Sequence, residues 1–133
     1  MRKLMLWGAA LCLAGCQTWG PTWSELTGQR YNLTSIEVGP IVINQIDGYT
    51  PSGGGPLEPV KITPGQHKVI LQPVPPGSVM GNVHLEETTF DAKPCVRYYL
   101  NARFKTSTST EWSPFVDHEE PIPGCQLPGA GAK

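Results

Sequence analysis

Three histidines and a group of carboxylates are the residues whose types could support chemistry. They are His67, His84 and His118, with Asp117, Glu119 and Glu120. A metal site needs several such ligands converging with fixed geometry. Asp117 and His118 are adjacent, so an extended chain would point them to opposite faces. Solvated histidines beside an acidic segment are the simpler interpretation, and we expect no metal and no other cofactor.

The chain also lacks the short motifs that mark hydrolytic sites. Neither Gly-x-Ser-x-Gly nor His-Glu-x-x-His occurs in it. Glu86 and Glu87 are neighbours on opposite faces of any strand, a poor geometry for joint acid–base work. Residues 53–55 are three glycines, but no Gly-Lys-Ser/Thr follows to complete a phosphate-binding loop. We therefore expect a protein that is not an enzyme.

The N-terminal residues have the pattern of an export signal. Residues 1–3 contain Arg2 and Lys3, and residues 4–13 are apolar. About ten apolar residues are too few to cross a bilayer as a helix, which needs ~20, but they suit the core of a signal peptide. The following stretch, Leu13-Ala14-Gly15-Cys16, resembles the lipobox of bacterial lipoproteins.

The lipobox resemblance implies cleavage before Cys16 and acylation of this cysteine. Residues 1–15 would then be a signal peptide, and the acyl chains would anchor the protein to a membrane. Gln17 stands where an Asp would favour retention in the inner membrane, so the resemblance implies the outer membrane, with the protein facing the periplasm. The alternative is an ordinary signal peptide with an incidental cysteine.

Export and acylation would leave only two cysteines with free thiols that could form a disulfide. Cys12 would be removed and Cys16 acylated, so Cys95 and Cys125 would remain. Two remaining cysteines in an exported protein favour a disulfide, which here would close a loop of about 30 residues. The alternatives are a metal-binding pair or a reactive thiol.

Charge excludes one large class of partner. The chain has ten Lys and Arg against eleven Asp and Glu, with no basic run, so we expect no nucleic-acid binding. Loss of residues 1–15 would leave eight Lys and Arg against the same eleven acids, a net charge of −3.

Short strands separated by turn residues organise the rest of the chain, which is rich in Gly and Pro. The predicted strands are residues 31–38, 41–46, 60–62, 66–74, 83–90, 95–105 and 111–117. Seven short strands without a helical period predict an all-β fold, a single antiparallel β-sandwich of immunoglobulin- or transthyretin-like architecture. We expect this domain to occupy residues 30–133, with 16–29 as lipid anchor and tether.

The segment 95–105 has the clearest alternation in the chain. One predicted face is apolar, with Val96, Tyr98, Leu100, Ala102 and Phe104, and the other is polar, with Arg97, Tyr99, Asn101, Arg103 and Lys105. Aromatic and guanidinium groups on a rigid sheet are typical of a binding patch, so Arg97, Tyr99 and Arg103 are the candidate partner-binding residues. The alternative is an ordinary solvated sheet face. We expect these three residues to matter more for partner capture than for stability.

Residues 41–71 resemble a PEGA-type module, a small β-domain of exported and envelope proteins. The shared features are the apolar "IVI", then Ile46-Asp47-Gly48, a Gly-rich loop, and "VKITPGQHKVIL". The resemblance implies a binding or structural role and supplies no catalytic residues.

These observations together predict a lipid-anchored envelope lipoprotein that acts as a non-catalytic periplasmic binding or assembly module. Its expected partners are the membrane, through the lipid, and an envelope protein or polymer. The alternative is an envelope enzyme or metal-binding protein that uses the His, Asp and Glu groups.

Overall fold

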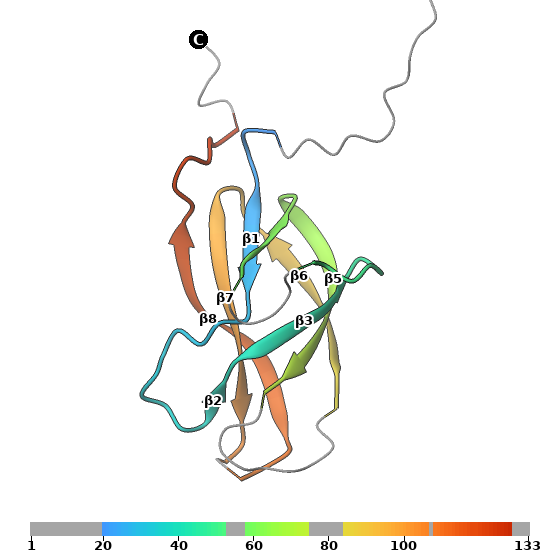
Figure 1. The fold of residues 1–133 in the computed structure, drawn as a ribbon, viewed down its shortest axis with the longest axis vertical. Helices are drawn as coiled ribbons and strands as arrows, with labels where there is room; N and C mark the ends of the chain where they lie inside the picture. The colour runs from blue at the N-terminus through green and yellow to red at the C-terminus, as the bar shows by residue number, and fades with distance from the viewer. Residues whose placement is uncertain (1–19, 53–57, 75–83, 107, 129–133) are drawn as a thin grey trace, which may run out of the picture.

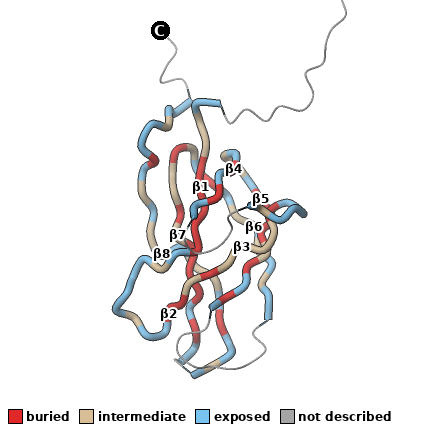
Figure 2. Tube along the Cα trace, viewed as in Figure 1, coloured by how far each residue is buried: buried red, intermediate tan, exposed pale blue. Residues whose placement is uncertain are grey.

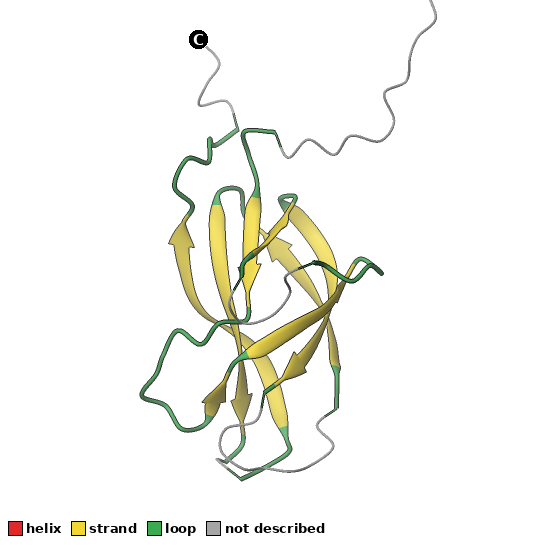
Figure 3. Cartoon of the chain, viewed as in Figure 1, coloured by secondary structure: helices red, strands yellow, loops and turns green. Residues whose placement is uncertain are grey.

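Eight strands in two sheets make up the part of the chain that the computed structural model describes, residues 20–52, 58–74, 84–106 and 108–128 (Figures 1 and 3). They are β1 (Ser24–Thr27), β2 (Val38–Gly39), β3 (Ile41–Ile46), β4 (Val60–Ile62), β5 (Gly65–Pro73), β6 (Glu86–Ala92), β7 (Val96–Phe104) and β8 (Trp112–Pro121). Within these ranges there is no helix, and so none with the length and apolarity needed to cross a membrane. The predicted all-β sandwich is confirmed.

Strand β7 is the centre of the larger, five-stranded sheet. It pairs with β8 along its whole length, and with β1 and β2 over different residues. Strand β4 extends the sheet beyond β1, while β3, β5 and β6 form the smaller sheet in that order. The prediction of a purely antiparallel sandwich was wrong, because β1 runs parallel to β7. Among the described residues β8 pairs only with β7 and is an edge strand, which suits Pro114 because proline has no N–H to donate to a further strand.

Strand β1 corrects the predicted domain boundary. All four of its residues are buried, and it lies between β4 and β7, inside the segment 16–29 that was expected to be a tether. The folded domain therefore begins before Ser24. The predicted strand 31–38 was also wrong apart from Val38, because Arg30 hydrogen-bonds to the carbonyls of Asn32 and Ser35 and holds these residues in a loop.

The core lies between the two sheets, where alternate residues of the long strands meet (Figure 2). Its largest fully buried apolar side chains are Phe104, Leu26, Ile41, Ile46, Ile62, Leu71 and Val69. Burying one aliphatic or aromatic side chain of this kind contributes ~1.5–3 kcal/mol, so this layer is the main source of stability.

Two close backbone arrangements fix how the chain passes between the sheets. The amide of Ile41 donates to the carbonyl of Gly28 at 2.9 Å, and a Cβ on Gly28 would lie 1.5 Å from the Ile41 oxygen, so only glycine fits. After β3, Asp47 and Gly48 both have positive φ, 50° and 86°. This is the type I′ hairpin turn that an Asp-Gly pair favours.

The predicted disulfide between Cys95 and Cys125 is present in the structure, with a Cα–Cα distance of 5.5 Å. It lies at the end of the sandwich where the chain enters β1. There the amide of Cys95 donates to the carbonyl of Trp23 at 2.8 Å, and the amide of Gln126 donates to the carbonyl of Pro21 at 2.8 Å. The bond therefore ties the C-terminal segment to both β7 and the entry of β1.

We expect the variant Cys95→Ser/Cys125→Ser to unfold at a lower temperature than the wild type. Opening a loop of 30 residues removes ~3–4 kcal/mol in the chain-entropy model, or roughly 10–20 °C for a domain of this size. Thermal unfolding with and without reductant measures the shift, and reductant should leave the serine variant unchanged. Mass spectrometry that finds two free thiols in unreduced protein would contradict the assignment.

Candidate binding surface on the five-stranded sheet

A row of charged residues crosses the outer face of the five-stranded sheet. The strand register places Lys61 opposite Glu25, Glu25 beside Arg97, and Arg97 opposite Glu120. Each comes from a different strand, β4, β1, β7 and β8, and the sign of the charge alternates along the row. Tyr98, the next residue along β7, is buried in the core, so Arg97 points away from it.

Arg97 is the hub of this row. Its Nε donates to Glu25 Oε2 at 2.6 Å, and its Nη1 donates to Glu120 Oε1 at 2.8 Å. The Tyr99 hydroxyl donates to the same Glu120 oxygen at 2.7 Å, and Trp23 Nε1 donates to Glu25 Oε1 at 3.1 Å. The Glu25 side chain is only 9% exposed. Four strong contacts therefore satisfy two carboxylates that the fold has partly removed from water.

The same contacts shift the ionisation of the network. The hydrogen bond to Glu25 raises the pKa of Arg97 above its usual range. The pKa of Glu120 is lowered, first by the hydrogen bond from the Tyr99 hydroxyl and then by Arg97. Burial raises the pKa of Tyr99, and the neighbouring Glu120 carboxylate raises it further. These shifts favour the cation at Arg97, the carboxylate at Glu120 and the neutral hydroxyl at Tyr99 at neutral pH.

An aromatic stack covers the next row of the sheet. The register places Tyr99 opposite His118, and the ring of Tyr31 lies flat on the His118 ring, with centroids 3.8 Å apart and planes 7° from parallel. Tyr31 also meets the Tyr99 ring edge-on at 5.2 Å. Tyr31 belongs to the β1–β2 loop (residues 28–37), so this stack attaches the loop to the sheet.

The side chain of Asn101 holds the start of the loop. It was predicted to be exposed, but it is fully buried, because the loop folds over it. Its Nδ2 donates to the carbonyls of Gly28 at 3.2 Å and Gln29 at 2.9 Å, and its Oδ1 accepts from the amide of Tyr31 at 3.3 Å. The loop's path is thus set by hydrogen bonds to β7.

A bulge in β8 holds the next part of the loop. Between the pairs Tyr99–His118 and Leu100–Val116 the register shifts, which leaves Asp117 as an extra residue on β8. Its carboxylate accepts a hydrogen bond from the amide of Asn32 at 3.2 Å. Beyond this contact the loop presents two apolar side chains to solvent, Leu33 (76% exposed) and Ile36 (69% exposed).

The three predicted partner-binding residues do not form one patch. Arg97 and Tyr99 share the charged network, whereas Arg103 is exposed near the other end of β7, with its guanidinium 4.4 Å from the Phe115 ring. The exposed loop residues were missed because residues 31–38 were interpreted as a strand. Leu33 and Ile36 are three residues apart and cannot share one face of a strand, which was a signal against that interpretation.

The histidines of the alternative hypothesis lie in separate places. His67 Nδ1 is 2.6 Å from Asp47 Oδ2, and His84 Nε2 is 3.1 Å from Glu86 Oε2, while His118 is in the aromatic stack. Across the described parts of the chain, no group of three His, Cys, Asp or Glu side chains is placed to hold a metal ion.

We expect Arg97→Ala to destabilise the fold by about 1–3 kcal/mol, because it leaves a nearly buried Glu25 carboxylate without its cation. Arg103→Ala, the matched control on the same strand, should change stability by less than about 0.5 kcal/mol. Denaturant unfolding measures both. Adding Glu25→Gln to Arg97→Ala should recover part of the loss, and equal effects of the two arginine variants would contradict the assignment of Arg97 as hub.

The network also predicts how acid affects stability. The pKa of Glu120 in the folded protein lies below its ordinary value of 4.5, so folding favours the carboxylate. Its contribution is present above pH 4.5 and is lost as pH falls through the folded-state pKa. The stability difference between wild type and Glu120→Gln, from unfolding curves at several pH values, should be largest near neutrality and shrink in acid. A difference that grows in acid, or one that the exposed Glu119→Gln reproduces, would contradict this.

No protein-family model, no curated protein and no solved structure matches the chain. The resemblance of residues 41–71 to a PEGA-type module therefore stays a prediction. The function of the chain has to be argued from its own surface and from its N-terminal residues.

Proposed function

We propose that the protein is a lipid-anchored lipoprotein of the outer membrane that faces the periplasm and acts as a non-catalytic module for binding or assembling an envelope protein. The residues Leu13-Ala14-Gly15-Cys16 support the anchor. The observation that carries the binding role is the β1–β2 loop, which is fastened to β7 and β8 and exposes apolar side chains.

The exposed part of this loop suits a protein partner. We call Tyr31, Leu33 and Ile36 the loop surface; their side chains are 49%, 76% and 69% exposed. An aromatic and two aliphatic groups with a polar rim match the composition of interface centres. Burying Leu33 or Ile36 would contribute up to ~1.5–3 kcal/mol each. Because Asn101 and Asp117 already hold the loop, little further ordering opposes binding.

The charged network plays a supporting part in this proposal. Two of the five N–H donors of Arg97 bond to Glu25 and Glu120 within the protein. The charge of this guanidinium is therefore already compensated by two carboxylates, and a partner carboxylate would gain less from binding it than from binding a free arginine. We therefore assign partner contact mainly to the loop surface, and to Arg97 and Tyr99 the positioning of the sheet beneath it.

Site-specific photo-cross-linking in intact bacteria tests the proposal. A photoreactive side chain at position 36 should give a discrete adduct, and the adduct should be lost in Leu33→Asp. The same probe at Leu85, an apolar residue that is 51% exposed elsewhere on the domain, is the control. Equal labelling from both positions would reject the loop surface.

A separate measurement, on the variant Cys16→Ser, tests the lipid anchor. Cys16→Ser should stay uncleaved or leave the membrane fraction, as shown by fractionation and by the mass of the mature chain. If Cys16→Ser matures and fractionates like the wild type, the lipoprotein assignment fails whatever the cross-links show.

A further inference from the structure

We propose that the disulfide end of the sandwich is a membrane-contacting surface that rests on the phospholipid headgroups. The disulfide end is formed by residues 20–23, 63–65, 93–95 and 121–128. The inference rests on the proposed anchor at Cys16 and adds an orientation: the opposite end, residues 105, 106 and 108–111, points away from the bilayer.

The first support is where the chain enters the domain. Pro21 and Thr22 are both bonded to Gln126, through the Gln126 amide and carbonyl, and the carbonyl of Trp23 accepts from Cys95. Residues 21–23 are therefore part of the disulfide end (Figure 1). Only residues 17–20 separate Pro21 from Cys16, and five Cα–Cα steps of about 3.6 Å span at most ~18 Å. An acylated Cys16 would thus hold this end within ~18 Å of the lipid.

The second support is the charge of this end. Its four segments contain one charged residue, Lys93. The carboxylates beside these segments, Glu119 and Glu120, belong to β8, and Arg97 compensates the charge of Glu120. The four segments lie together, since Ser24 Oγ donates to the carbonyl of Lys93 and Ser24 pairs with Ile62, the residue before Thr63. The opposite end differs, with the exposed ion pair Lys105–Glu111. Anionic headgroups attract lysine and disfavour carboxylates, so the disulfide end is the one suited to a lipid surface.

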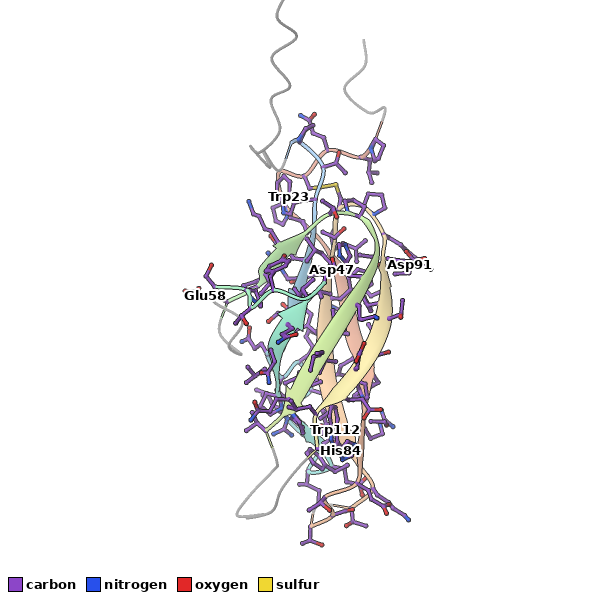
Figure 4. The ribbon with its side chains drawn as sticks, turned by 90° about the vertical axis from the view of Figure 1, so that its right-hand side faces the viewer. Trp23, Asp47, Glu58, His84, Asp91 and Trp112 are labelled. Atoms are coloured by element: carbon purple, nitrogen blue, oxygen red, sulfur yellow. A yellow bond between two sulfur atoms is a disulfide. The ribbon has the colours of Figure 1, made fainter. Side chains whose placement is uncertain are left out.

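The third support is the apolar character of the exposed groups. Beside the disulfide, an open groove of about 450 Å³ is lined by Pro94, Val96, Ile122 and Leu127, with Glu119 and Glu120 also along it. Leu127 is 56% exposed. Trp23 lies at the same end (Figure 4), with the Lys61 ammonium 4.6 Å from its ring centroid. Tryptophan is enriched at membrane–water interfaces, and anionic headgroups attract lysine, so we commit the groove to lipid.

Spin labels on the full-length, lipidated protein test this orientation. Single cysteines replace Lys93 or Leu127 at the disulfide end, and Glu111 at the opposite end as control. All three residues are exposed, so the labels should not disturb folding. The labelled proteins are reconstituted in vesicles of phosphatidylethanolamine and phosphatidylglycerol, and collision with oxygen or an aqueous nickel chelate is measured.

The labels at positions 93 and 127 should collide with the nickel chelate several-fold less often than the label at position 111. The label at position 127 should also collide with oxygen more often than the label at position 111. If the protein floats with the vesicles but all labels collide equally with the chelate, the orientation is wrong and the anchor stands. Labels at 93 and 127 that reach neither reagent would mean that protein covers this end, which also overturns the proposal. If the protein does not float with the vesicles, the proposed lipid anchor at Cys16 is wrong.

Discussion

The buried carboxamide of Asn101 is the constraint on which the outer face of this domain depends. A polar side chain that is fully removed from water must find hydrogen-bond partners, since each unsatisfied group costs about 1–3 kcal/mol. Asn101 lies in β7, the strand with the most neighbours, and its partners are the carbonyls of Gly28 and Gln29 and the amide of Tyr31. The chain after β1 must therefore turn over β7 as a loop, which brings Tyr31 onto His118.

The same strand imposes a second condition four residues earlier. Arg97 lies between Glu25 and Glu120, which come from the strands on either side of β7. Each of these three charges has an oppositely charged neighbour within hydrogen-bond distance, so the row stabilises the sheet. The β1–β2 loop, which projects from the sheet in Figure 1 and exposes Leu33 and Ile36, is left as the part of this face with unused contact area. Stability and recognition are thus divided between adjacent regions of one surface.

Strands with a local signal were predictable, and features that depend on distant partners were not. The bounds of β3 and β4 match the prediction, and β7 matches within one residue, because β-branched runs and alternation show in the sequence itself. Strand β1, with the sequence SELT, has one apolar residue, and its Glu25 is buried only because Arg97 and Trp23 cover it. No local pattern contains that information.

In the candidate site, too, features with a local sequence signal were predicted and features that depend on distant residues were missed. Alternation along β7 correctly separated Arg97 and Tyr99 from the core, and counting cysteines identified the disulfide. Alternation also assigned Asn101 to solvent, because it says which face a residue occupies but not what covers that face. Only the tertiary structure places residues 28–31 over Asn101 and makes the loop surface visible as a candidate.

Amide hydrogen exchange in the variant Asn101→Leu tests the central claim most directly. Leucine keeps similar volume and removes every hydrogen bond from this side chain to the loop. We predict that the amides of residues 29–34 exchange at least about tenfold faster, the factor expected when ~1.4 kcal/mol of local stabilisation is lost, while β5 and β6 remain as protected as in the wild type. Unchanged exchange in residues 29–34 would contradict the claim that Asn101 fixes the loop.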